Sequence, residues 1–279
     1  HKHGRAWRLV PRLNPDVNSY WMCDEGRFTY HALREQRLAG AVIDGLPAGW
    51  DRAIRAAADQ LAPALSNGAR AIGVVLSAEA TNEDNFALAK LAKAWGASVY
   101  TAGKPPVPGR ADGRLRTDDV NPNTAGVAAI ASALGLPVAP VGDLSADIRT
   151  LVMLGSELPG VDDAALAELS IIAIASHEVG PVRAARIALP AAAWAEVSGT
   201  ITNHDGLVQR MHAAFVAPGQ ALPGWEAVVR LAQATGHKLA YAHAREVFKD
   251  MTQAVSAWSS LTWARDARPL ALRFAGSRG

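Results

Sequence analysis

Residues 71–101 read AIGVVLSAEATNEDNFALAKLAKAWGASVYT, and this stretch decides the fold. It opens with the apolar run 71–76, whose length and valines are typical of a fully buried strand. Thr81, followed three residues later by Asp84, is a helix-capping signal, and apolar residues then recur at helical spacing. Gly96 ends that helix, and a second apolar strand closes the stretch. A strand, a helix and a strand at this spacing predict a βαβ unit, and therefore a parallel sheet.

Strands and helices continue to alternate outside this stretch. Apolar runs predict strands at 150–154, 171–176 and 187–189, and helical signals cover 46–67, 124–133, 225–235 and 242–258. The fold class predicted is therefore α/β, with a Rossmann-like parallel sheet flanked by helices. The turn at 77–80 contains no glycine, whereas a dinucleotide-binding turn needs glycines so that the backbone can approach the pyrophosphate. We therefore expect no nicotinamide or flavin fingerprint at this turn.

Composition restricts the possible functions. The chain has 279 residues, of which 49% are apolar and 19% charged, enough to bury a sizeable core. A net charge of +2 argues against a nucleic-acid surface, which would show clustered lysine and arginine. One cysteine excludes an intramolecular disulfide framework and fits a reducing compartment. No uncharged apolar run of about 18 residues occurs, so membrane association is expected only through partner subunits.

The single cysteine, Cys23, lies in residues 14–28, NPDVNSYWMCDEGRF, which we call the cysteine loop. Tyr20, Trp21 and Phe28 place apolar surface around the sulfur, and a thiolate in such a shell is suited to a soft metal or an iron–sulfur cluster. A free cysteine is equally explained as a small buried hydrophobic residue, and one thiolate cannot hold a cluster that needs about four ligands. Residue type alone leaves both interpretations open.

A second informative stretch is 186–209, RIALPAAAWAEVSGTITNHDGLVQ. It predicts a strand that ends at Leu189, a helical turn that starts at Pro190 and a stop at Gly199. The residues after Gly199 predict a hairpin around Asn-His-Asp-Gly, with His204 at its tip. A ligand role for His204 is conceivable, but a turn residue explains it better.

The cysteine loop, preceded by Arg-Leu-Val-Pro at 8–11, and the stretch 186–209 together resemble the molybdopterin-oxidoreductase superfamily. Within it, they most resemble the large iron–sulfur subunit of NADH–quinone oxidoreductase, respiratory complex I. The resemblance implies that Cys23 is the fourth ligand of a [4Fe–4S] cluster, after three ligands in a C-x-x-C-x-x-x-C run. No residue before Cys23 is a cysteine. In the second stretch the sequence agrees with the superfamily pattern at nine positions: Leu189, Pro190, Ala191, Glu196, Gly199, Thr200, Asn203, Gly206 and Gln209.

The resemblance implies three parts in the chain. Residues 1–45 would be the truncated end of a 4Fe-4S subdomain, 46–265 a molybdopterin-oxidoreductase-like α/β domain, and 266–279 a basic tail. The chain opens at His1 and runs into the apolar alternation 6–10, which we interpret as a strand entered partway. We therefore expect the C-terminal part of a longer polypeptide that carries the other cysteines.

No molybdopterin is expected. Glu25 stands where many relatives have Lys or Arg, and an acid there would lower the potential of a nearby cluster; a solvated surface glutamate is the alternative. In the loop 155–160, Glu157 would repel the phosphates of a pterin dinucleotide, although an ordinary Gly-Pro turn also explains this loop. The chain is also short, and no second cysteine remains to ligate molybdenum.

Two further groups of residues are candidate sites. Asp118 and Asp119 could bind a hard cation, but adjacent side chains point apart, which favours a solvated pair. His177 and Glu178 follow a strand end, but a catalytic pair would need a third group and a cleft, which favours a loop role.

The resemblance implies an iron–sulfur subunit that passes electrons from NADH and FMN through clusters to quinone. This chain would be mostly a pterin-free scaffold and not catalytic by itself. Its partners would be the other peripheral-arm subunits of complex I, including the flavin subunit, on the cytoplasmic side of the inner membrane. One alternative is the cluster and pterin subunit of an NAD-linked formate dehydrogenase or hydrogenase. Another is a non-redox assembly module that kept only the fold.

Overall fold

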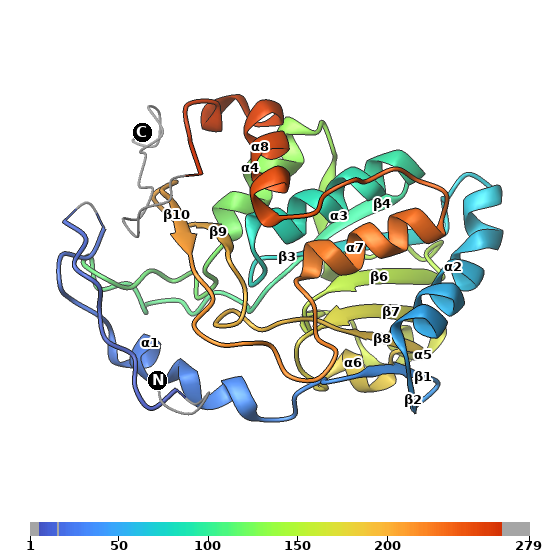
Figure 1. Cartoon of the computed structure of the whole chain (residues 1–279), viewed down its shortest axis with the longest axis horizontal. Helices are drawn as coiled ribbons and strands as arrows, with labels where there is room; N and C mark the ends of the chain where they lie inside the picture. The colour runs from blue at the N-terminus through green and yellow to red at the C-terminus, as the bar shows by residue number, and fades with distance from the viewer. Residues whose placement is uncertain (1–5, 16, 264–279) are drawn as a thin grey trace.

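The computed structural model describes residues 6–15 and 17–263. Its strands and helices follow one another as the sequence predicts, with some additions (Figure 1). The strands are β1 Ala41–Ile43, β2 Leu46–Ala48, β3 Ile72–Ser77, β4 Ser98–Ala102, β5 Val138–Pro140, β6 Thr150–Leu154, β7 Ser170–Ala175, β8 Ile187–Pro190, β9 Gly199–Thr202 and β10 Val208–Met211. The α-helices are α1 Asp24–Phe28, α2 Trp50–Ser66, α3 Asn82–Trp95, α4 Thr124–Ala133, α5 Asp163–Glu168, α6 Pro181–Ala184, α7 Gly224–Ala234 and α8 Ala244–Ala254. Three 3-10 helices are η1 Thr29–Arg34, η2 Val141–Asp143 and η3 Ser256–Trp258.

Eight strands form one sheet in the order β2-β1-β8-β7-β6-β3-β4-β5. The neighbours from β8 to β5 run parallel, whereas β1 pairs antiparallel with both β8 and β2. Strands β9 and β10 form a separate antiparallel hairpin. The predicted fold class, a mostly parallel sheet flanked by helices, is confirmed.

The βαβ unit forms as its residues predict. Thr81 Oγ1 accepts the backbone N–H of Asp84 at 3.1 Å, and the Asp84 carboxylate accepts the backbone N–H of Thr81 at 3.4 Å, so both halves of the capping box are present. Gly96 ends α3 with φ at 73°, a left-handed conformation that glycine adopts without strain. Strand β4 then returns parallel to β3, with Gly73 opposite Ser98.

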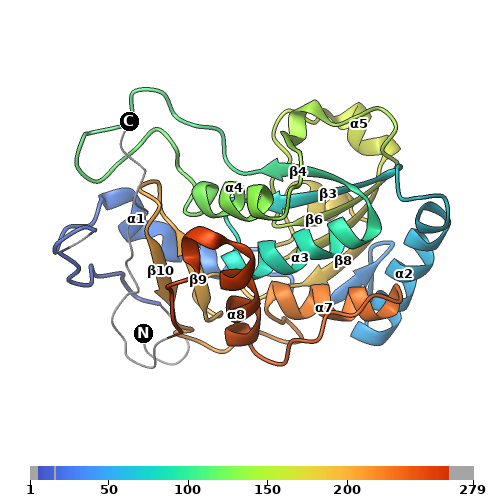
Figure 2. The same ribbon diagram turned by 90° about the horizontal axis from the view of Figure 1, so that it is seen from above.

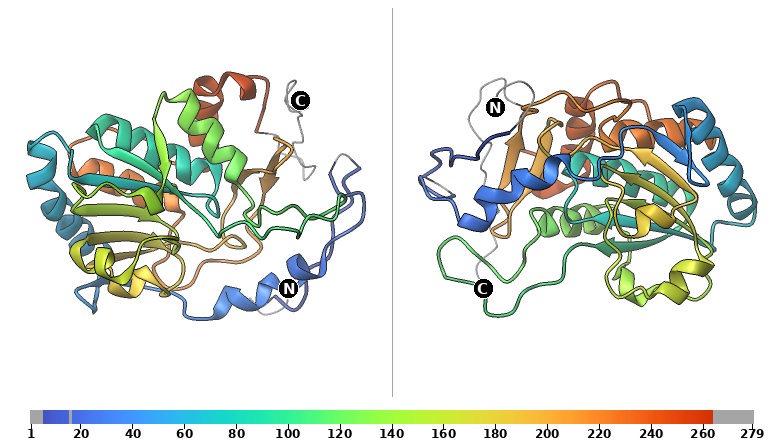
Figure 3. Two further views of the ribbon diagram at one scale, coloured as in Figure 1. Left: turned by 180° about the vertical axis from the view of Figure 1, so that it is seen from behind. Right: turned by 90° about the horizontal axis from the view of Figure 1, so that it is seen from below.

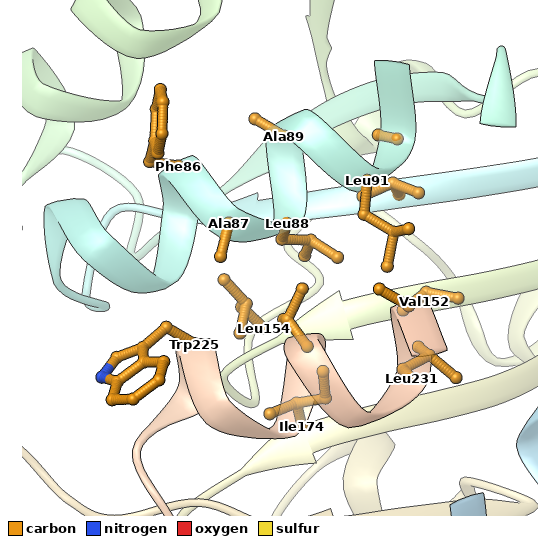
Figure 4. Close-up of a cluster of buried hydrophobic side chains, with 14 of the residues drawn as sticks. Phe86, Ala87, Leu88, Ala89, Leu91, Val152, Leu154, Ile174, Trp225 and Leu231 are labelled. Atoms are coloured by element: carbon orange, nitrogen blue, oxygen red, sulfur yellow. The ribbon is translucent and has the colours of Figure 1, made fainter. Parts of the chain in front are cut away.

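Two apolar layers cover the sheet. Helices α2, α3, α4 and α7 pack on one face, with α8 packed against α3, and the short helices α5 and α6 with η2 cover the other face (Figures 1 and 2). Figure 4 shows the larger layer, in which α3 and α7 lie over β6 and β7. Its labelled side chains, nearly all fully buried, are Phe86, Ala87, Leu88, Ala89, Leu91, Val152, Leu154, Ile174, Trp225 and Leu231. Helix α8 buries Val247, Phe248 and Met251 in this same core.

Three expectations of secondary structure are wrong. Residues 6–10 form no strand: within the described chain they have no neighbouring strand to pair with, and Trp7 and Val10 are exposed. Pro190 ends β8 instead of starting a helix, because its carbonyl accepts the N–H of Leu222 and it pairs with Ala175 of β7. The helix expected at 46–67 starts later, at Trp50, because Leu46–Ala48 forms β2 and pairs with β1.

The sheet extends back into the N-terminal part, since β1 pairs with β8 through Val42 and Ala188. The boundaries 1–45 and 46–265 therefore stay a prediction, and the basic tail 266–279 lies outside the described residues. In the described parts of the chain, no helix combines the length and apolar character needed to span a bilayer.

Candidate functional site

Cys23 is the N-cap of α1. Its backbone is extended, with φ −69° and ψ 152°, and its Sγ accepts the backbone N–H of Gly26 at 3.3 Å. A Cβ added at Gly26 would lie 3.3 Å from that sulfur, so glycine leaves the thiol close to the backbone. The side chain is half-buried and forms no disulfide. An N–H donor stabilises a thiolate and is one of the contacts that set cluster potentials.

The sequence on both sides of Cys23 exposes several large apolar side chains. Many of the large hydrophobic side chains that are exposed lie between residues 7 and 28: Trp7, Val10, Leu13, Tyr20, Trp21 and Phe28. The Tyr20 and Trp21 rings lie 5.1 Å apart between centroids, and Phe28 stacks with His31. Exposed apolar side chains that gather in one segment are typical of interaction sites.

The donor chemistry of Cys23 fits an iron–sulfur ligand. A soft thiolate, a backbone N–H aimed at it and apolar neighbours are what such a cluster requires. Among residues 6–15 and 17–263, no group of three or more His, Cys, Asp or Glu side chains could hold a metal ion. A cluster bound at Cys23 would therefore take its other ligands from further thiolates, and the ligand assignment stays a prediction.

The cysteine loop is held against residues 103–123, which we call the long loop. Figures 1 and 3 show the two segments side by side. Arg110 donates from Nε to Glu25 Oε2 at 2.8 Å and also from Nη2, while Arg116 Nη1 lies 3.5 Å from Glu25 Oε1. Glu25 is partly exposed, as a surface residue would be, but its charge is matched by two guanidinium groups. Sequence reasoning missed this contact.

A buried ion pair fixes the N-terminal segment to the sheet. Arg37 Nη1 and Nη2 donate to the two Glu196 oxygens at 2.5 and 2.7 Å, and their side chains are only 10% and 7% exposed. Arg37 Nε also donates to the carbonyl of Ser176 at 2.9 Å, and Glu196 accepts the N–H of Ala193. Glu196 is one of the positions matched in 186–209, and this pairing gives it a physical role.

His177 also holds the N-terminal segment, through a contact with Ala32 in η1. Its Nε2 lies 2.9 Å from the Ala32 carbonyl and its Nδ1 2.8 Å from Ser176 Oγ. Because a carbonyl can only accept, Nε2 carries the proton and Nδ1 accepts from the hydroxyl. Burial lowers the pKa of His177, so the ring is held neutral. The interpretation of His177 as a loop residue is confirmed, whereas His204 is exposed at the hairpin turn beside Asp205.

The order of the sheet reverses between β3 and β6, and ligands of open α/β folds bind outside the carboxyl ends of such strands. Just beyond β3, Glu79 pairs with Lys104 at 2.7 Å, so the charge of this lysine is already balanced. Glu157 lies partly buried in the loop after β6. The loops after β3 and β6 therefore each carry a carboxylate, Glu79 and Glu157, and Lys104 is paired with the first.

A buried polar network begins α3, where sequence reasoning recognised only a cap. Glu83 accepts the N–H of Thr200 at 2.7 Å and its hydroxyl at 2.9 Å, and Asn82 donates to the hydroxyls of Thr200 and Thr202. Asp84 accepts the N–H of Trp225 at the start of α7. Burial raises the pKa of Glu83 to about 8. The four consecutive polar residues 82–85 at the start of α3 could have indicated this network in the sequence. A buried helix end must satisfy its polar groups, so polar partners were to be expected.

Part of the chain matches a known protein family. Residues 123–234 match the molybdopterin oxidoreductase family, a stretch that runs from α4 to α7 and includes the buried Glu196 and the β9–β10 hairpin. The resemblance of the stretch 186–209 to the molybdopterin-oxidoreductase superfamily is thereby confirmed.

The relatives that share part of their sequence with this chain include several kinds of oxidoreductase. The F420-dependent formate dehydrogenase 2 subunit alpha of Methanococcus maripaludis is 41% identical over 83 residues, 29% of this chain and 12% of that protein. A nitrate reductase of Klebsiella oxytoca is 43% identical over 70 residues, 24% of this chain and 8% of that protein. A subunit of the NADH-quinone oxidoreductase of Streptomyces coelicolor is 32% identical over 99 residues, 33% of this chain and 11% of that protein. Each match spans about a tenth of the relative's own length.

Proposed function

We propose that this chain belongs to the iron–sulfur subunit of an NADH–quinone oxidoreductase. Cys23 would be the fourth ligand of a [4Fe–4S] cluster, and the α/β part would be a pterin-free scaffold. The observation that carries the proposal is the Cys23 thiol, which caps α1, accepts the Gly26 N–H and has the exposed aromatic residues Trp21 and Phe28 close to it in sequence. Relatives named as subunits of NADH-quinone oxidoreductase support it.

When bound, a [4Fe–4S] cluster supplies one-electron transfer. In this chain Cys23 would bind one iron as a thiolate, and the Gly26 N–H would offset part of the negative charge on the sulfur. Tyr20, Trp21 and Phe28 would exclude water from that side of the cluster. The ion pairs at Glu25 and Arg37 would hold the cysteine loop and the segment after it against the sheet.

A pterin-free scaffold is favoured by the charges at the carboxyl edge of the sheet. A pterin dinucleotide carries phosphates, which need donors or positive charge. Lys104 is already paired with Glu79, and Glu157 adds a further carboxylate. The route of electrons from NADH and flavin to quinone, the flavin subunit as partner and a place on the cytoplasmic side of the inner membrane belong to the same proposal.

The test is the iron content and the EPR spectrum of the full-length protein with Cys23→Ala. We expect the loss of one [4Fe–4S] signal and of about four iron atoms per protein. Met22→Leu, a neighbouring change that conserves volume, serves as the matched control and should keep both. If Cys23→Ala retains the full iron content and every signal, Cys23 is not a ligand.

A second candidate function is the cluster and pterin subunit of a formate dehydrogenase. The relatives named formate dehydrogenase subunit alpha, at 31–41% identity over 83 residues, favour it. Metal analysis separates the two, because a pterin enzyme carries stoichiometric molybdenum or tungsten and the scaffold proposed here carries iron alone. A protein with neither iron nor a group-six metal would instead support the non-redox assembly module.

A further inference from the structure

We propose that Glu83 and Arg210 form a proton-operated switch that joins the β9–β10 hairpin to the segment after α8. While Glu83 carries a proton, the Arg210 guanidinium group lies over the ring of Trp263. When Glu83 releases that proton to solvent, the guanidinium group is drawn to the carboxylate and the contact with Trp263 is lost. The inference concerns the α/β part of the chain and goes beyond the proposed function, because it needs no metal at Cys23.

The hairpin places Arg210 on the side where Glu83 is bound. Arg210 of β10 lies directly opposite Thr200 of β9, and side chains of opposed residues project from the same face of a sheet. Thr200 gives Glu83 both its backbone N–H, at 2.7 Å, and its hydroxyl, at 2.9 Å. Burial lowers the pKa of Arg210, and the charge of the Glu83 carboxylate opposes that effect. The two side chains are therefore within electrostatic range of each other.

The Arg210 guanidinium group lacks the acceptors that a buried cation needs. Its Nε and Nη1 atoms are covered from solvent and have no hydrogen-bond partner within the described parts of the chain. The contact that the structure shows is with Trp263, whose ring centroid lies 4.3 Å from Cζ. A buried charged donor without an acceptor costs free energy, so a carboxylate that becomes charged nearby should attract it.

Trp263 connects this contact to α8. Its ring centroid lies 5.3 Å from that of Phe248, and Phe248 is buried in the main core. The cation–π contact with Arg210 adds a second attachment, between Trp263 and the hairpin. Residues 256–263 should therefore be held more firmly when the guanidinium group lies over this ring.

Glu83 is the member of the pair that changes charge. It is fully buried, and burial raises its pKa to about 8; the bonds from Thr200 oppose this effect, and the neighbouring Asp84 adds to it. Asp84 is itself buried and accepts the backbone N–H at the start of α7. An arginine keeps its positive charge throughout this range of pH. The attraction between the two side chains therefore appears only when Glu83 loses its proton.

The other charged groups on the elements around α3 are already accounted for. Lys90 of α3 is paired with Asp250 of α8, and Glu226 is paired with Arg230 within α7. Helix α4 contains no charged residue. The pKa of His212, just after β10, is lowered by desolvation and by two nearby arginines, so this ring is neutral above pH 7. The pH dependence between pH 7 and pH 9 should therefore come from Glu83.

The first test is a ¹³C NMR titration of the Glu83 carboxyl group in the full chain, assigned by comparison with Glu83→Gln. We expect a midpoint at about 8 in the wild-type protein. The midpoint should rise by about one pH unit in Arg210→Gln, because loss of a nearby positive charge disfavours the carboxylate. Arg230→Gln is the matched control, since it also removes an arginine that lies over a tryptophan ring, 5.3 Å from that of Trp50, and it should leave the midpoint unchanged. A wild-type midpoint near 4.5, or an unmoved midpoint in Arg210→Gln, would overturn the inference.

The second test follows the contact with Trp263. Hydrogen-exchange protection factors of residues 256–263, corrected for the intrinsic rate at each pH, should fall between pH 7 and pH 9 in the wild-type protein. They should stay high at both values in Glu83→Gln and be low at both in Arg210→Gln. Arg210→Lys keeps the charge without the planar group, so it should keep the Glu83 midpoint close to that of the wild-type protein and still lose protection. Protection in the wild-type protein that does not change with pH would overturn the switch even if the midpoint shifts.

Discussion

Glu83 and Thr200 lie 117 residues apart in sequence and form a bidentate contact, in which the carboxylate accepts both the backbone N–H and the hydroxyl of Thr200. The contact joins the start of α3 to β9. It is fully buried, and burial raises the pKa of Glu83 to about 8. The hairpin is therefore attached to the sheet domain through a group that titrates near neutral pH.

Glu83 should make stability depend on pH. In the unfolded chain its pKa is 4.5 and in the folded chain about 8, so the folded state retains the proton between these values. The contribution of Glu83 to the free energy of unfolding is complete below pH 4.5 and is lost as pH rises through 8. The free energy of unfolding falls by at most about 1.4 kcal/mol per pH unit in this range. Glu83→Gln should flatten this slope in urea unfolding between pH 5 and 8.5.

The exposed Glu168 provides the control for this prediction. Glu168→Gln should leave the slope unchanged, because this side chain is exposed to solvent in the folded protein. A slope that survives in Glu83→Gln would show that another group produces it.

The buried pair of Arg37 and Glu196 should be costly to break. Arg37→Met leaves a buried carboxylate without its partner, so the free energy of unfolding should fall by about 3–5 kcal/mol. The double variant Arg37→Met with Glu196→Leu should be less destabilised than the sum of the two single variants. Chemical denaturation of all four proteins measures this coupling.

The matched control is the exposed pair of Arg186 and Asp44, whose nearest atoms lie 3.4 Å apart. Arg186→Gln should change stability little, because exposed ion pairs contribute little. If Arg37→Met were equally mild, the buried pair would not hold the N-terminal segment.

Gly126 allows the polar network to close. A Cβ there would lie 2.1 Å from the Asn82 side-chain oxygen and 2.2 Å from that of Asn123. Gly126→Ala should therefore destabilise the fold by about 1–3 kcal/mol, as overpacking does. Gly40→Ala is the control, since nothing lies within 4 Å of its Cβ position and it should be tolerated. Thermal unfolding compares the two, and equal melting temperatures would contradict the close packing around Gly126.

Protonation of His177 at acid pH should loosen the N-terminal segment. Its pKa lies below 6.5 in the folded state because of burial, so the unfolded chain binds a proton first as pH falls. Its stabilising contribution is complete above pH 6.5 and declines below it. The hydrogen-exchange protection factors of residues 29–38, which are corrected for the intrinsic exchange rate at each pH, should fall between pH 7 and pH 5, and less so in His177→Gln. His204→Gln, at an exposed turn, should behave as the wild-type protein does.

Much of the regular structure could be predicted from the sequence. The predictions of the capping box at Thr81, the stop at Gly96 and the hairpin at 199–211 are confirmed, because each depends on residues close together in the chain. The strand expected at 6–10 was wrong, because a strand also needs a partner, and periodicity does not reveal one.

The sequence by itself determined the parallel α/β class, the relation to molybdopterin oxidoreductases and the candidate ligand Cys23, since these reside in local patterns and short motifs. Tertiary structure alone decided which charges meet. Glu25 and Arg110 are 85 residues apart, and Arg37 and Glu196 are 159 apart. Local patterns carry no information about such pairs, because the order of the strands and the path of the long loop bring the partners together.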